Sequence, residues 1–219
     1  MKKKKWLRLL WVLGISCFAV FTACTGPDPY KTYTPVITGT YESYAAMEKG
    51  QSQAAILGPP DTLEELQEHS DIIVQGFLQD DAKNEITNKD GFITGGSTTS
   101  TLYITKVLRG ASGISPASNL TIYEPYYVHT IAGESHLVYI SHYLPAEPGK
   151  EYIFFLTRNQ YGNYVVDCFE NSRFPLPDAQ TRSGAEIDAL TAEDLYLAEG
   201  VDLESYKALY REVLEAYAE

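Results

Sequence analysis

Cys168, Asp167 and His142 are the residues of this sequence that could form a catalytic nucleophile with its general base. A thiolate beside an imidazole attacks acyl groups, so the three together would indicate covalent hydrolysis. The alternative is that Cys168, at the end of an apolar run, is a small core residue. We favour this second interpretation, because the chain contains no HExxH, CxxC or GxSxG motif and no glycine-rich phosphate loop.

Metal binding is the second chemistry that the sequence could support. Four acids in one polar segment could form a cation site: Asp80, Asp81, Glu85 and Asp90. Their spacing does not match an EF-hand loop, and a solvated connection between strands is the favoured interpretation. His136 and His142 fall on one side of a predicted strand but ~20 Å apart, too far to share an ion. His129 and Glu134 lie in a predicted loop and have no assignable role. We therefore expect neither a metal nor another cofactor.

Cys24 is the third chemically distinctive residue, because it follows a charge-free apolar segment. Lys2–Lys5 and Arg8 form a basic start, and the 15 residues Leu9–Ala23 carry no charge. A basic n-region, a short apolar core and a small-residue cleavage site describe a secretory signal, so residues 1–23 are predicted to be removed. An uncleaved spanning helix is the alternative, but the apolar run is shorter than the ~20 residues needed to cross a bilayer.

The residues Phe21-Thr22-Ala23-Cys24 resemble the lipobox of bacterial lipoproteins. In that family the cysteine receives a diacylglyceryl thioether and becomes the first residue of the mature chain. The resemblance implies that Cys24 is lipidated and that the lipid bilayer is its partner, on the extracytoplasmic face of the cell membrane. The family prefers Leu where this chain has Phe21. Cys17 is a competing candidate, but the apolar core before it would be too short.

Charge and cysteine content narrow the remaining possibilities. Removing residues 1–23 removes five bases and no acid, which changes the formal net charge from −12 to −17. A surface of that sign repels nucleic acid and anionic lipid head groups, so both are excluded as expected partners. Cys168 would be the only cysteine besides the lipidated one, so the stability must come from a packed core instead of a disulfide.

The composition divides the mature chain into three parts. Residues 24–60 are rich in Pro, Gly, Thr, Ser and Tyr and are predicted to be a tether, although residues 34–44 suit an edge strand equally well. Residues 61–180 begin with a helix over Leu63–His69, capped by Thr62, with acids in its first turn. Six strands are predicted after it: Asp71–Leu78, Thr99–Leu108, Asn119–Tyr123, His136–Tyr143, Glu151–Thr157 and Tyr164–Phe169. The polar segment 80–100 is predicted to be a loop that runs into the strand from Thr99.

Residues 181–219 are predicted to be helical and packed on the strands. Thr191 resembles a helix cap followed by acids, and Gly200 would separate that short helix from a longer one. Five residues of the last segment recur at spacings of three and four and form an amphipathic stripe: Leu203, Tyr206, Tyr210, Val213 and Tyr217.

The series SDIIVQGFL, TLYITKVLRG, LTIYEP and GKEYIFFLT resembles the netrin-like and metalloproteinase-inhibitor domains. It resembles uncharacterised lipoproteins of Gram-positive bacteria more closely. The resemblance covers about residues 62–166 and implies a small, mainly antiparallel OB-like barrel. The expected fold class is α+β, with a short preceding helix and C-terminal helices. The inhibitors chelate a target's zinc through a disulfide-bonded N-terminal cysteine, which has no counterpart near Ser70, so no inhibitory residue can be carried over.

Two functions remain at this point. The first is a non-catalytic lipoprotein that binds a protein, peptide or glycan at the cell surface. The second is an extracytoplasmic hydrolase or metal-dependent enzyme with an unrecognised site. An enzyme requires titratable groups within mutual reach, whereas a binding module shows exposed aromatic residues. We favour binding.

Overall fold

The computed structural model of the chain describes residues 41–52, 60–90, 92–177 and 184–218. Cys17, Cys24 and the predicted signal lie outside these residues, as does most of the predicted tether. None of the helices that the structure describes is both long enough and apolar enough to cross a membrane.

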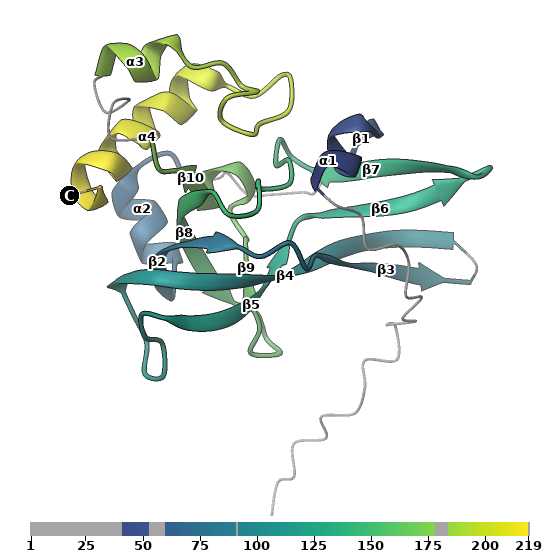
Figure 1. The fold of residues 1–219 in the computed structure, drawn as a ribbon, viewed down its shortest axis with the longest axis horizontal. Coiled ribbons are helices and arrows are strands. Elements are labelled where there is room, and N and C mark those ends of the chain that lie inside the picture. Colours follow the sequence, from purple (N-terminus) through teal and green to yellow (C-terminus); the bar gives the residue numbers. More distant parts are fainter. Residues whose placement is uncertain (1–40, 53–59, 91, 178–183, 219) are drawn as a thin grey trace, which may run out of the picture.

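Five strands form a closed β-barrel, the dominant feature of a mostly β structure with a few helices (Figure 1). The barrel strands are β2 (Ile72–Leu78), β4 (Phe92–Arg109), β5 (Ser118–Glu124), β8 (Glu151–Arg158) and β9 (Tyr164–Val165). They pair in the order β8-β2-β4-β5-β9, and β9 returns to β8 to close the ring. The pairs are antiparallel except β5–β9, which is parallel. The prediction of a small barrel is confirmed.

Strands β2 and β8 are buried on both faces because the barrel and the helices cover opposite sides of them. Ile72 and Val74 point into the barrel cluster, whereas Ile73 between them joins a second apolar cluster under the helices. A side-chain period of two produces this division along one strand. The short strand β10 (Arg173–Pro175) pairs with β8 and extends the sheet beneath the second cluster.

Helix α2 (Leu63–His69) begins as predicted, with the Thr62 hydroxyl accepting a hydrogen bond from the Glu65 amide at 3.3 Å. The last helix, α4 (Leu203–Tyr217), packs on the second cluster and hydrogen-bonds to the sheet. Its Tyr206 hydroxyl donates to the Arg173 carbonyl at 2.9 Å. The predicted docking of the C-terminal stripe is therefore confirmed.

The helix predicted to start at Thr191 does not form. Thr191 does accept a hydrogen bond from the Asp194 amide at 3.2 Å, as a cap would, but the chain continues as turns. A bridge between Tyr143 and Leu197 then ties this segment to the barrel side. The short helix lies earlier, as α3 (Gly184–Ala189).

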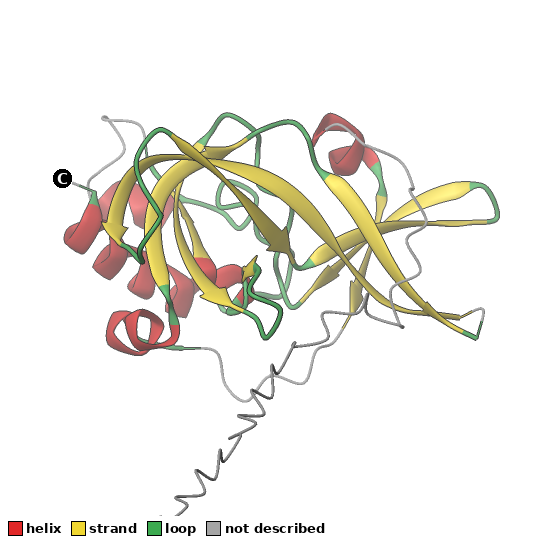
Figure 2. Ribbon diagram, turned by 90° about the horizontal axis from the view of Figure 1, so that it is seen from below, coloured by secondary structure: helices red, strands yellow, loops and turns green. Residues whose placement is uncertain are grey.

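The segment predicted to be a polar loop is a β-hairpin. Strand β3 (Lys83–Lys89) pairs with the first half of β4, and both project beyond the barrel (Figures 1 and 2). The loop prediction was wrong because most residues of this arm are exposed or half-buried, which removes the apolar alternation expected of a strand.

A second hairpin, of β6 (Tyr126–Ile131) and β7 (Glu134–Ile140), crosses the first at its base. The Asn84 side-chain amide donates to the Val128 carbonyl at 2.5 Å and accepts from its N–H at 2.7 Å. Gly96 permits this close crossing, because a Cβ there would lie 2.5 Å from the Tyr127 ring. The two hairpins are thus held together at the base.

Residues 34–44, predicted to be either a tether or an edge strand, are described by the structure only from Tyr41 onward. Residues 41–44 belong to α1 (Tyr41–Ala46), so the edge strand is wrong for them, and residues 34–40 lie outside the described part. A strand does follow, as β1 (Glu48–Ser52), which pairs parallel to β7.

The last predicted strand, Tyr164–Phe169, is shorter than expected. It ends at Val165, and a 3-10 helix, η1, covers Phe169–Ser172.

Candidate functional site

A groove of about 520 Å³ lies between the three-stranded sheet β1-β7-β6 and the segment 192–199. Its lining combines aromatic and apolar surface with a few charges. The lining residues are Tyr44, Lys49, Leu137, Tyr139, Leu144, Pro145, Ala192, Glu193, Tyr196, Leu197, Ala198 and Glu199. The groove has the size and mixed lining of a ligand-binding site.

Arg173 supports two of the segments that line the groove. Its guanidinium is fully buried and donates hydrogen bonds to the carbonyls of Leu144 at 2.8 Å and Tyr196 at 2.9 Å. The same guanidinium lies 4.3 Å from the centroid of the Tyr143 ring. One cation thus connects two lining residues, Leu144 and Tyr196, to the barrel core.

A buried carboxylate completes this support. Glu124, at the end of β5, accepts hydrogen bonds from Ser100 at 2.6 Å and from the Tyr143 hydroxyl at 2.7 Å. Burial raises the pKa of the Glu124 carboxyl, while these hydrogen bonds and the Arg173 charge act in the opposite direction. Because its oxygens are occupied inside the barrel, Glu124 supports the groove and does not contact what the groove would hold.

The ring of Tyr196 lines the groove, and its hydroxyl is held by two neighbouring side chains. Lys150 Nζ donates to its hydroxyl at 3.1 Å and lies 4.6 Å from its ring centroid, and the hydroxyl donates to Glu147. These contacts orient a half-buried ring along the wall. Glu193 and Glu199 are exposed at the groove, and Lys49 is the one basic residue among those that line it. The groove therefore has a net negative lining.

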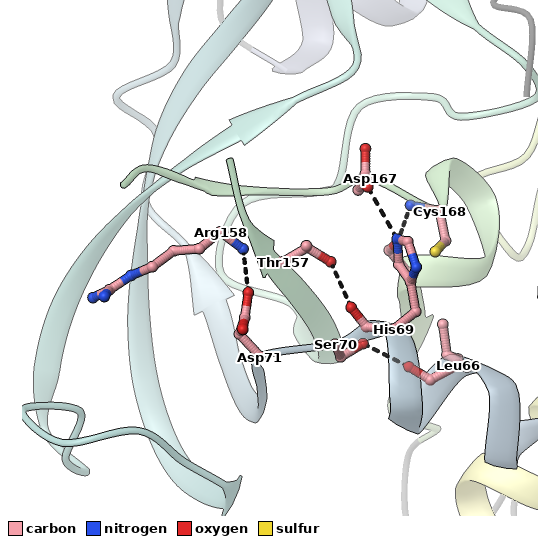
Figure 3. Close-up of polar contacts among 9 residues, drawn as sticks. Leu66, His69, Ser70, Asp71, Thr157, Arg158, Asp167 and Cys168 are labelled. Atoms are coloured by element: carbon pink, nitrogen blue, oxygen red, sulfur yellow. Dashed lines mark hydrogen bonds and ion pairs between the residues drawn. The ribbon is translucent and has the colours of Figure 1, made fainter. Parts of the chain in front are cut away.

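The residues proposed for nucleophilic catalysis are not brought together. Asp167 binds His69 Nε2 at 3.0 Å (Figure 3), whereas His142 Nδ1 lies 3.2 Å from Glu170. Cys168 is 5% exposed, and burial, followed by the charge of Asp167, raises the pKa of its thiol to about 11. A neutral, enclosed thiol is a poor nucleophile, so the geometry favours the interpretation of Cys168 as a core residue.

Ser141, His142 and Glu170 form a cluster that the sequence did not reveal. The Ser141 hydroxyl donates to Glu170 Oε1 at 3.0 Å, and the His142 amide donates to Oε2 at 3.2 Å. In a catalytic triad the hydroxyl contacts the imidazole and the carboxylate contacts the far side of the ring. Here the hydroxyl and the ring both contact the carboxylate, so this arrangement stabilises the turn after β7 and does not activate a nucleophile.

The acids considered as an alternative cation site are not gathered into one either. Asp81 accepts hydrogen bonds from the Thr101 amide at 2.9 Å and hydroxyl at 2.6 Å, which secures the start of the hairpin. Asp90 lies seven residues along the hairpin from Lys83, at the opposite end of β3 from Asp81. Among the described residues, no three His, Cys, Asp or Glu side chains come close enough to hold a metal ion.

His129 and Glu134 belong to strands, not to the loop that was predicted. His129 on β6 is the cross-strand partner of His136 on β7, and their ring centroids are 6.0 Å apart. Glu134 begins β7 beside the hairpin turn.

Comparison of the chain with protein-family models, curated proteins and solved structures gives no match. What the groove binds is therefore inferred from the residues that line it.

Proposed function

We propose that this protein is a membrane-anchored extracytoplasmic lipoprotein whose α+β, OB-like barrel is a non-catalytic binding module. The observation that carries the binding proposal is the groove of about 520 Å³, with a tyrosine on each wall; the catalytic candidates Cys168, Asp167 and His142 are not among its lining residues. The OB-like assignment is supported by a closed ring of five strands, one parallel pair and the grouping of α2, α3 and α4 at one end.

The ligand class that suits the groove best is a basic segment of a peptide or protein. Glu193 and Glu199 face a single lining base, Lys49, so a cationic side chain gains from the electrostatics there. Tyr139 and Tyr196 supply apolar faces and ring edges that pack against the rest of such a segment. A neutral glycan would use the same tyrosines but gain little from the two carboxylates.

The anchor is tested at Cys24. In cells that export the protein, Cys24→Ala is expected to abolish incorporation of a clickable palmitate analogue and to release the protein from the membrane fraction. The reason is that no other mature cysteine is accessible, since Cys168 is buried in the domain. Cys168→Ala serves as the matched control and should label like the unmodified chain. Equal labelling of Cys24→Ala and the unmodified chain would contradict the anchor.

A further inference from the structure

The two hairpins carry exposed apolar side chains at their tips, at the end of the molecule opposite α2, α3 and α4 (Figures 1 and 2). Phe92 and Ile93, where β4 begins, are 75% and 41% exposed, and Ile131, where β6 ends, is 52% exposed. In the described part of the chain the other large exposed hydrophobic residue is Tyr161, in the β8–β9 turn. Single exposed apolar residues are ordinary, but three at one end indicate a contact surface.

The tips are held in a fixed arrangement. The Asn84 side chain bonds both backbone groups of Val128, and the Thr98 hydroxyl donates to the Tyr126 carbonyl at 2.8 Å. These contacts join the hairpins at the base, where they leave the barrel. The two apolar tips therefore project from a common, hydrogen-bonded base.

The N-terminal segment joins the fold on the same hairpin that carries Ile131. Tyr44 of α1 lies edge-on against Tyr126, with ring centroids 5.7 Å apart, and β1 pairs with β7 from His136 onward. Cys24 stands 17 positions before Tyr41 in the sequence. A chain of that length spans at most about 60 Å. A lipid on Cys24 would thus keep the start of α1, and the hairpin on which it packs, within about 60 Å of the bilayer.

We propose that Phe92, Ile93 and Ile131 form a second membrane contact, which inserts into the interface of the bilayer that holds Cys24. This proposal rests on the proposed lipid anchor. The charged residues at the tips are Lys89, Asp90 and Glu134, a set with no net positive charge to attract anionic head groups. The contact is therefore made by apolar insertion, and the surface it fits is that of a zwitterionic lipid. Together the two contacts would fix the orientation of the groove relative to the membrane.

Tryptophan fluorescence tests the contact, because both native tryptophans, Trp6 and Trp11, precede Cys24. The mature chain is coupled through Cys24 to a maleimide phospholipid in phosphatidylcholine vesicles. The buried Cys168, with its raised thiol pKa, reacts slowly under these conditions. Three variants are compared: Phe92→Trp, Ile131→Trp and, as the matched control, Tyr161→Trp. Chemical coupling makes this test independent of whether cells lipidate Cys24.

We expect both tip variants to shift their emission to shorter wavelength and to be quenched by brominated phosphatidylcholine, while Tyr161→Trp remains unquenched. The proposal is overturned if the tip variants are quenched no more than the control, or if only one tip is quenched. It is also overturned if the emission shift occurs equally without vesicles, since the tips would then bury each other between copies of the chain. Absence of lipid label from Cys24 of the unmodified chain in cells would contradict the anchor, and it would leave the result of the vesicle experiment unchanged.

Discussion

Val213→Asp is expected to unfold the domain or to lower its free energy of unfolding by about 3–5 kcal/mol. Val213 has no exposed surface and lies in the apolar cluster that α4 forms with β8 and β10. A carboxylate there is desolvated without a partner, and a 15-residue helix has little stability apart from its packing. The free energy follows from urea denaturation of the chain from Thr25 to Glu219.

Glu215→Ala is the matched control, two residues further along α4 and exposed. It should change the free energy of unfolding by less than ~0.5 kcal/mol. If Val213→Asp is as stable as this control, then α4 is not part of the core, and its apolar stripe becomes a free surface.

Arg173→Met should have the second large effect, a loss of about 3–5 kcal/mol. Methionine removes the guanidinium that binds the carbonyls of Leu144 and Tyr196, and it leaves the buried Glu124 without a nearby cation. The same change is expected to loosen the groove, because those two carbonyls belong to residues that line it. Arg158→Met is the control, since that side chain is exposed over the Tyr164 ring.

The stability of Arg173→Met should also depend on pH. Burial already raises the folded-state pKa of Glu124 above its unfolded value, and the Arg173 charge opposes that rise. A raised carboxyl pKa means that the folded state binds more protons, so stability is greatest at low pH and falls as the pH rises through the folded value. Without Arg173 the pKa rises further. The variant should therefore lose more stability, relative to the unmodified chain, at about pH 8 than at about pH 5. An equal loss at both would show that Glu124 and Arg173 do not interact.

Strong local patterns were sufficient for part of the fold. The helix Leu63–His69 carries its cap and first-turn acids in sequence, and the strands β2, β5 and β8 are short apolar runs bounded by turn residues. The apolar stripe on α4 is regular because this face of the helix packs on the second apolar cluster. In each case the local signal and the tertiary packing agree, so the sequence alone predicts the element.

The hairpins and the groove could not be predicted in the same way. Residues of β3 are mostly half-buried, so their alternation is weak, and the first half of β4 with which they pair is also mostly exposed or half-buried. The groove combines β1, β7 and segment 192–199, which are remote in sequence. Only the abundance of tyrosine, 17 residues in all, hinted at a contact surface, without saying where.

The central claim is that the groove binds a basic partner segment outside the cell, and photo-crosslinking tests it directly. A benzoylphenylalanine is placed at Tyr139, on the groove wall, or at Tyr161, on the remote turn, in the full chain on its own cells. We predict a discrete adduct from Tyr139 and none from Tyr161. The adduct should disappear when Glu193→Lys and Glu199→Lys are added, and persist with Glu215→Lys. An adduct pattern common to both positions, or one from Tyr139 that survives reversal of both groove acids, would contradict the account.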